Sequence, residues 1–397
     1  MNEEKPPVAR LIAERSMGLA MSAIKEMSIR SAKVPGAASL AWGLPSFRTP
    51  APIRAAVAHA LEDDPKAGMY ALPAGLPELR SAAAREHLRR TGKHVDPDTR
   101  VMISAGNMEG LQSLFQAIID LGDEVIVTDP GFVSHISQIR FNGGVPVFWQ
   151  MDEANGWQLD IDALPGLIGS RTKAIVLVTP SNPTGAILSK VTLQAAASIA
   201  REHGLLMILD DPYSHFTYEN RDLFYNLASD PEYADSIAYL FTFSKAYAMS
   251  GWRAGYMVVP ETLLTEVVKI HDLTMICTPR ISQIAACAAL ENDPLHLDEF
   301  QRILARRRAL ICERLDRVGH VFQYQKPQGA YYVFPRIVAA HDNSVQFSLD
   351  LLNRAKVTVT PGSAFGPSGE HHVRMAYCVE DDAINLAFDR IEAYFGR

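Results

Sequence analysis

Short apolar runs alternate with amphipathic stretches along the first two thirds of the chain. Seven runs are short, mostly apolar and rich in β-branched residues, as buried strands are. They cover residues 101–104, 124–128, 145–149, 174–179, 205–210, 237–243 and 254–259. Apolar residues recur at helical spacing over 51–61, 77–89, 106–120 and 189–202. Strands that alternate with helices predict an α/β fold with a mostly parallel sheet.

The pattern changes after residue 261, where it becomes mostly helical and then mixed. A long charged helix is expected over 295–318, linking a large lobe to a small one. Short strands are expected at 321–324, 330–334, 357–360 and 373–376, with helices near 344–355 and 380–395. At the N-terminus, the sequence of residues 1–34 predicts a helical arm.

These patterns suggest a division into a large lobe and a small lobe built from both chain ends. We expect 1–48 to form an N-terminal arm and part of the small domain, and 49–294 to form the large domain. Residues 295–397 would form the small C-terminal α+β domain. A chain of 397 residues is long enough for about two to three domains.

Composition excludes several classes of partner. A formal net charge of -7 leaves no basic surface to hold nucleic acid or anionic lipid. No apolar run approaches the length of a membrane span, and the charged first thirty residues do not resemble a signal peptide. We therefore expect a cytoplasmic protein that binds neither nucleic acid nor membrane.

The four cysteines lie far apart in the sequence. Cys277, Cys287, Cys312 and Cys378 form no CxxC pair and show no spacing with histidine that is typical of a zinc site. We interpret them as reduced core residues and expect no bound metal.

The most informative stretch is 242–256, TFSKAYAMSGWRAGY, which lies between two predicted strands. A lysine that is partly desolvated and placed near other cations favours its neutral, nucleophilic amine. Arg253, eight residues later, supplies such a cation for Lys245. Thr242, Ser244 and Arg253 also offer the hydroxyl and guanidinium donors that a phosphate needs. An amine beside a phosphate site suggests pyridoxal 5'-phosphate.

The whole stretch closely resembles the lysine signature of the class I/II aminotransferases, which are fold type I enzymes that depend on pyridoxal phosphate. The resemblance extends over nearly the whole chain. It implies that Lys245 holds the cofactor aldehyde as a Schiff base. It also implies a large domain with a mostly parallel seven-stranded sheet and a small α+β domain.

A second stretch suits the cofactor phosphate. The strand at 101–104 runs into a helix that opens with Gly106, Asn107 and Met108. Free backbone N–H groups and the positive end of the helix dipole favour an anion there. Every βα unit ends in this way, so the prediction depends on its agreement with Thr242, Ser244 and Arg253.

Several further residues match family positions around the cofactor ring. Phe132 matches an aromatic residue that stacks on the ring, although a core phenylalanine would also fit a strand end. Asn182, in the turn SNPTG, and Tyr213 match residues that hydrogen-bond the phenolic oxygen. Asp210 would pair with the protonated ring nitrogen, which makes the ring an electron sink. Asp211 competes for this role, but the family spacing Asp-x-x-Tyr favours Asp210.

Two residues are expected to face the substrate. Arg374 follows a glycine-rich stretch and can bind a carboxylate through two parallel N–H donors, as the family arginine binds the α-carboxylate. An arginine in a strand can also be an exposed edge residue. Gly43 matches a loop that crosses the mouth of the family active site, although the loop could equally be a linker.

The resemblance also implies a homodimer with shared active sites. Tyr70 matches a tyrosine that reaches the cofactor phosphate of the partner subunit, although it could simply pack in its own turn. The N-terminal arm carries apolar residues that need a surface to cover. They are Met17, Leu19, Met21 and Ile24.

Together these residues predict an aminotransferase that moves the amino group of an L-amino acid to a 2-oxo acid. Lys245 would move the proton between the substrate Cα and the cofactor C4′. Met108 stands where relatives that favour dicarboxylates often carry lysine, and Leu44, Trp42 and Tyr331 lie in segments expected near the same pocket. Neutral or aromatic donors are therefore expected.

Three alternatives remain open at the level of sequence. Arg48 or Arg280 could supply the missing charge and give an aspartate-type aminotransferase. The same site could run a C–S β-lyase reaction, because both reactions share a carbanion intermediate. A regulatory domain would need a DNA-binding module, and we expect none in the first forty residues.

Overall fold

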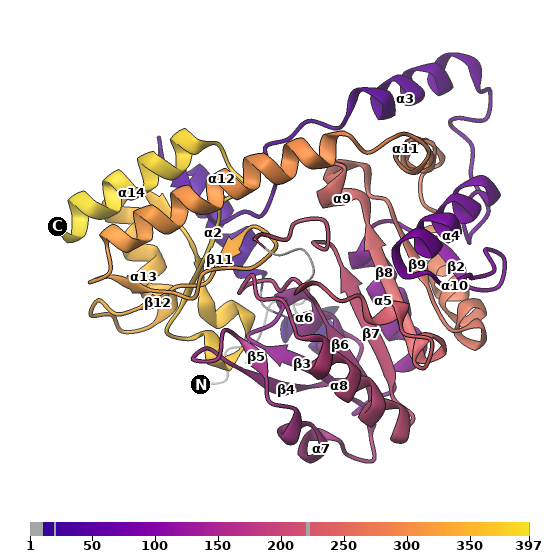
Figure 1. Ribbon diagram of the computed structural model, residues 1–397, viewed down its shortest axis with the longest axis horizontal. Helices are drawn as coiled ribbons and strands as arrows, with labels where there is room; N and C mark the ends of the chain where they lie inside the picture. Colours follow the sequence, from indigo (N-terminus) through magenta and orange to yellow (C-terminus); the bar gives the residue numbers. More distant parts are fainter. Residues whose placement is uncertain (1–10, 20, 220–222, 397) are drawn as a thin grey trace.

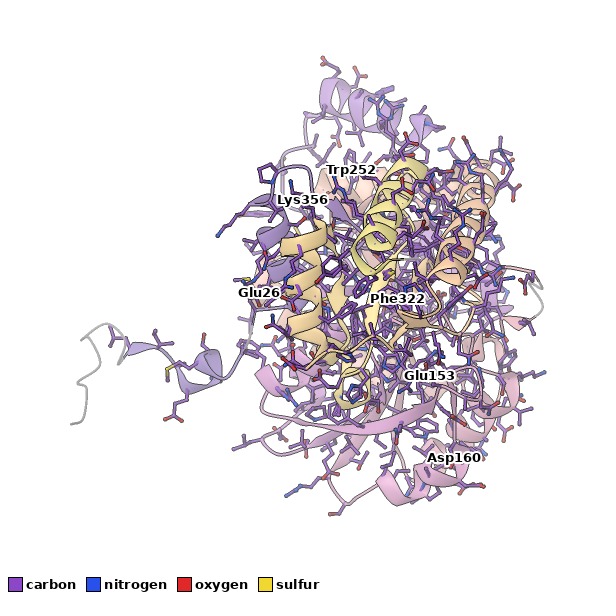
Figure 2. The ribbon with its side chains drawn as sticks, turned by 90° about the vertical axis from the view of Figure 1, so that its left-hand side faces the viewer. Glu26, Glu153, Asp160, Trp252, Phe322 and Lys356 are labelled. Carbon is purple, nitrogen blue, oxygen red and sulfur yellow. The ribbon has the colours of Figure 1, made fainter. Side chains whose placement is uncertain are left out.

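The computed structural model describes residues 11–19, 21–219 and 223–396. The predicted helical arm over 1–34 therefore lies partly outside the described residues. Its described part forms two helices, α1 (Glu14–Met17) and α2 (Ala23–Ala32), in place of one continuous helix. Residues 18–22, which begin with Gly18, separate the two helices. Figure 2 shows α1 projecting from the body of the protein.

An eight-stranded sheet forms the centre of the large lobe, in the order β2-β9-β8-β7-β6-β3-β4-β5. The strands are β2 (Val101–Ser104), β3 (Glu124–Asp129), β4 (Val145–Asp152), β5 (Gln158–Leu159), β6 (Thr172–Leu177), β7 (Leu206–Asp211), β8 (Ile237–Thr242) and β9 (Gly255–Val258). Strands β9 and β5 run in the opposite direction to the other six strands of this sheet. Seven strands match the predicted runs. The eighth, β5, has two residues and pairs with the end of β4, beyond the predicted seven.

The strands are covered on both faces, which explains their nearly continuous apolar sequences. Alternate residues point to opposite faces, so Ile175 and Leu177 join one hydrophobic cluster while Ala174 and Val176 join another. Helices α3, α4, α8 and α11 pack in the first cluster, and α5, α6 and α10 pack in the second.

The described part of the large lobe contains seven longer helices. They are α3 (Ala51–Asp63), α4 (Pro77–Thr91), α5 (Asn107–Ile118), α6 (Val133–Phe141), α8 (Lys190–Glu202), α10 (Glu261–Met275) and α11 (Arg280–Glu291). Two one-turn helices, α7 (Leu164–Leu167) and α9 (Phe243–Ala246), come before β6 and after β8. In the described part of the chain, no helix is long and apolar enough to cross a membrane. Nor do the described residues contain a group of three or more His, Cys, Asp or Glu side chains that could hold a metal ion.

Helix α12 (His296–Arg317) runs from the large lobe across to the C-terminal part of the chain (Figure 1). That part contains α13 (Ser344–Asp350), a π-helical turn (Leu351–Ala355) and α14 (Asp381–Phe395), with short strands between them. The strands are β10 (Phe322–Gln323), β11 (Tyr332–Val333), β12 (Arg336–Ile337), β13 (Val357–Thr358), β14 (Thr360–Pro361) and β15 (Val373–Ala376). β12 falls outside the predicted strands.

The N-terminal segment joins this C-terminal part. Strand β1 (Ala38–Ser39) pairs in parallel with β13, and Leu40 N donates to Thr358 O at 2.8 Å. A hydrophobic cluster separate from the two faces of the large sheet contains residues of α12, α14, β13 and β15. The four cysteines are free, and three of them are buried.

Candidate active site

A cavity of about 230 Å³ lies beside the carboxyl ends of the central strands, where ligands bind in open α/β sheets. Twelve residues predicted from the sequence line it. They are Gly43, Asn107, Met108, Phe132, Asn182, Asp210, Tyr213, Thr242, Ser244, Lys245, Arg253 and Arg374. They come from segments up to 331 residues apart in sequence, so the fold brings the predicted residues together at one place.

Lys245 lies in α9, the single turn that follows β8. Thr242 caps this turn by accepting from Ser244 N at 3.2 Å. The Lys245 Nζ donates to Gly43 O at 3.0 Å. Burial lowers the pKa of Lys245 from 10.5 to about 8, with Arg374 and Arg253 also lowering it while Cys378 and Asp210 act in the opposite direction. The amine is therefore available as a nucleophile and base near neutral pH.

Asp210 is buried at the end of β7 and has two side-chain partners. Asn107 Nδ2 donates to its Oδ1 at 2.6 Å, and His135 Nε2 lies 3.0 Å from its Oδ2. The Asn107 side chain thus supports Asp210, whereas the sequence assigned Asn107 only to the phosphate. His135, on α6, was missed because its contact with Asp210 spans 75 residues and depends on how α6 packs against the sheet.

Asp211 points to the other side of the strand, as neighbouring residues in a strand do. Its Oδ2 accepts from Arg90 Nη2 and from the Tyr239 hydroxyl, both at 2.6 Å. Asp211 does not line the cavity that contains Asp210. The geometry therefore favours Asp210 over Asp211 as the acidic group of the site.

One end of the cavity fits a phosphate. Gly106 precedes α5 with a φ of 79°, and a Cβ at this position would lie 2.7 Å from Arg253 Nη2. Arg253 is itself held by Ala105 O, which accepts from Nη2 at 2.9 Å. The Thr242 and Ser244 hydroxyls lie 2.9 Å apart beside it. Hydroxyls, a guanidinium and the opening of a helix form the donor set that binds a phosphate.

The other end of the cavity contains Arg374 on β15. Its side chain is 1% exposed, and Nη1 donates to Asn182 Oδ1 at 3.2 Å while Nη2 donates to Ala41 O. The guanidinium also lies 4.6 Å from the centre of the Tyr332 ring. Among the described residues, Arg374 Nε has no hydrogen-bond partner. A buried guanidinium with a free donor fits a carboxylate ligand.

Tyr213 and Tyr332 form a hydroxyl pair next to Arg374. Their hydroxyl oxygens lie 3.0 Å apart. Burial and the neighbouring Tyr332 raise the pKa of Tyr213 well above its usual range, so Tyr213 stays protonated and can donate. Tyr331, which the sequence placed near the pocket, lies beside it, with its ring centre 6.0 Å from Lys245 Nζ and its hydroxyl donating to Gly43 O at 3.4 Å. Its neighbour Tyr332, which the sequence did not single out, lines the cavity itself.

The remaining wall of the cavity is apolar. Phe132 lines it, with its ring edge-on to His135 at 5.3 Å between centroids. Trp42, Met108 and Ile24 line it as well. The sequence assigned Ile24 to an arm that covers another surface, and the structure places it at the cavity of its own chain because α2 packs against the body of the protein.

Three residues named in the sequence analysis lie away from the cavity. Arg48 lines a separate cavity, and Arg280 pairs with Asp64 at 3.3 Å. Tyr70 lies on the surface with 76% of its side chain exposed. Tyr70 therefore does not pack within its own turn, which was the alternative left open by the sequence.

Comparison with known proteins identifies the family. Residues 38–391 match the family described as aminotransferase class I and II. The chain belongs to this family. Its members use pyridoxal 5'-phosphate, so the protein is a pyridoxal-phosphate-dependent aminotransferase-family enzyme, and the phosphate end and Lys245 fit that cofactor.

Individual relatives align over nearly their full length. The chain is 34% identical to an aspartate aminotransferase of Pyrococcus horikoshii, covering 96% of each chain. It is also 34% identical to an aromatic-amino-acid aminotransferase of Thermococcus litoralis, over 94% of this chain and 95% of that one. An alanine aminotransferase from Pyrococcus furiosus superposes with a TM-score of 0.89 at 32% identity, covering 96% of this chain and 99% of that one.

Proposed function

We propose that this aminotransferase moves the amino group of a neutral or aromatic L-amino acid to a 2-oxo acid. The observation that carries the proposal is Met108, which lines the cavity at the opening of α5. Relatives similar to this chain are named for aspartate, aromatic amino acids and alanine, so family membership alone does not choose the substrate. The substrate preference therefore depends on the side chains that line the cavity.

The proposed reaction assigns a task to each end of the cavity. Bound pyridoxal phosphate supplies an aldehyde for amino-group exchange and a ring that withdraws electrons. Arg374, with Asn182, binds the substrate α-carboxylate. Asp210, held by Asn107 and His135, places a negative charge at the ring nitrogen. The Lys245 amine would act as the base that moves the proton at the substrate Cα.

The apolar wall supports a neutral side chain. Among the described residues that line the cavity, the cationic side chains are Lys245, Arg253 and Arg374, and the proposal assigns each of them to the cofactor or the α-carboxylate. Neither Arg48 nor Arg280 lies at the cavity in this chain. A second carboxylate would therefore meet Met108, Ile24 and Trp42, whose surfaces suit apolar or aromatic groups.

A panel of amino donors tests this preference. Neutral and aromatic amino acids should exceed aspartate and glutamate in kcat/KM, with pyruvate and 2-oxoglutarate tried as acceptors. A lead of about tenfold or more for aspartate or glutamate would contradict the proposal, since it equals about 1.4 kcal/mol of transition-state binding. Release of pyruvate and ammonia without an acceptor would instead indicate a β-lyase.

A variant makes the same test sharper. Met108→Lys should raise kcat/KM for aspartate by about tenfold or more, because a contact between a cation and a carboxylate contributes about 1.5 to 3 kcal/mol. Leu121→Lys adds the same charge at an exposed position beyond the far end of α5 and should leave the preference unchanged. An equal effect of both variants would mean that net charge, and not position 108, sets the preference.

We further propose that the enzyme is a homodimer whose active sites are shared between subunits. Tyr70 and its neighbours Met69 and Leu72 are exposed, and so are Met17 and Met21 on the projecting N-terminal segment (Figure 2). Exposed apolar groups of this kind mark surfaces that other chains cover. Sedimentation should give the mass of a dimer, and Tyr70→Phe should weaken cofactor binding. A fully active monomer would contradict this proposal.

A further inference from the structure

The aspartate that ends β3 lies between the two lobes. The Asp129 side chain is 4% exposed, and it accepts from Ser368 Oγ at 2.8 Å and from Ser368 N at 3.1 Å. Gly366, in the same loop, has a φ of 122°, and a Cβ there would lie 2.2 Å from Asp129 Oδ1. The loop approaches this carboxylate so closely that only glycine fits at position 366.

A second acidic residue of the large lobe lies beside the other end of the same loop. Glu153, just beyond β4, pairs with Arg336 on β12, and its Oε1 lies 3.3 Å from His372 Nε2, although the described residues offer this nitrogen no hydrogen bond. Figure 2 shows Glu153 where the sheet of the large lobe meets the C-terminal part of the chain. His372 is buried and stacks on Phe334, with ring centroids 4.8 Å apart.

The segment between these contacts, residues 366–372, leads directly into the strand that carries Arg374. One residue, Val373, lies between His372 and Arg374. On the other side, Asp129 lies three residues before Phe132, and Gly131 N donates to Phe365 O at 2.7 Å. The Asp129 carboxylate therefore links the loop after β3, which carries Phe132, to segment 366–372, which precedes Arg374.

We propose that Asp129 and Glu153 are positioning residues, which fix segment 366–372 and thereby hold Arg374 at the correct distance from the cofactor. This proposal rests on the proposed function in one respect, that Arg374 binds the substrate carboxylate. A shift of about 1 Å in a binding group can lower activity about 100-fold, so the position of β15 matters even though neither carboxylate lines the cavity.

The electrostatics of Asp129 are consistent with a positioning role. Burial raises the pKa of Asp129 although both Ser368 donors act in the opposite direction. Burial of the ionised carboxylate therefore costs free energy, which the Ser368 donors offset only in part. Asp129→Asn keeps the shape and one acceptor oxygen, and it removes the cost of burying a charge.

The test measures carboxylate binding without turnover. The holoenzyme is titrated with 3-phenylpropionate, a carboxylate that lacks an amino group, and the absorbance of the bound cofactor gives its Kd. Asp129→Ala should raise this Kd, and the KM of the amino donor, by about tenfold, with cofactor affinity changed by less than about twofold. Asp129→Asn should give a smaller increase. Glu153→Gln should raise the Kd by about threefold, because Glu153 is more exposed than Asp129.

A matched control variant distinguishes a role in positioning Arg374 from a contribution to folding stability. Asp123 lies at the opposite end of the same strand, is also buried, and accepts from Asp120 N at 2.9 Å. Asp123→Ala should lower the melting temperature without changing the Kd. If Asp129→Ala lowers the melting temperature and leaves the Kd unchanged, the proposal is wrong.

Two further variants keep the outcome decisive. If Asp129→Ala does not fold, Ser368→Ala removes one donor and should raise the Kd by about threefold, and an unchanged Kd would overturn the proposal. Because the titration needs no amino transfer, it gives a result even if the proposed substrates fail. Arg374→Ala serves as the reference, since it removes the carboxylate contact itself.

Discussion

Replacement of Lys245 by alanine is expected to abolish amino transfer. The side chain supplies the primary amine that the cofactor aldehyde needs and the base that moves the substrate proton, so one substitution removes both functions. We expect kcat to fall by at least about 10⁴-fold, with the circular dichroism spectrum unchanged. Stopped assays with a neutral donor and pyruvate would measure the loss. The absorbance of the lysine-bound cofactor should disappear as well.

The control for this result keeps the positive charge. Lys245→Arg has a cationic side chain that cannot act as the amine, and it should be as inactive as the alanine variant. Partial recovery of the alanine variant by added methylamine would indicate that the missing group is an amine. More than trace amino transfer by either variant would refute the assignment of Lys245.

Replacement of Arg374 by alanine has the second-largest expected effect. KM should rise by about 10- to 100-fold for every α-amino acid tested, because a hydrogen bond to a charged group contributes about 1.5 to 3 kcal/mol. The factor should be similar for all donors, since they share the α-carboxylate. Initial rates over a range of donor concentrations would separate KM from kcat.

The pattern across donors distinguishes the possible roles of Arg374. Arg374→Lys keeps the charge but loses the paired donors, so it should lie between the wild type and the alanine variant. A loss confined to aspartate and glutamate would mean that Arg374 binds the side-chain carboxylate. Unchanged substrate binding would place the α-carboxylate site elsewhere.

Local patterns in the sequence were sufficient to predict the α/β fold, and the resemblance to the aminotransferase family supplied most of the predicted residues that line the cavity. Buried parallel strands leave nearly continuous apolar runs, and the residues after such runs, Asn182, Asp210 and Lys245 among them, lie at one edge of the sheet. The resemblance carried by residues 242–256 added the cofactor. The fold prediction is confirmed, and it depends on residues close together in sequence.

Contacts between distant segments were decided only by the tertiary structure. His135 and Asn107 meet Asp210 across 75 and 103 residues, and no local pattern marks such a pair. Tyr332 lines the cavity beside the predicted Tyr331, and its contact with Tyr213 spans 119 residues.

Separation along the chain also explains why the sequence did not predict the contacts that join the two lobes. Asp129 and Ser368 lie 239 residues apart, and Gly366 reads from sequence only as part of a glycine-rich loop. In the sequence, Asp129 directly follows the predicted strand 124–128, and a glycine-rich stretch precedes Arg374. Only the packing of one lobe on the other brings that carboxylate to the Ser368 donors, because the contact exists only once both lobes have folded.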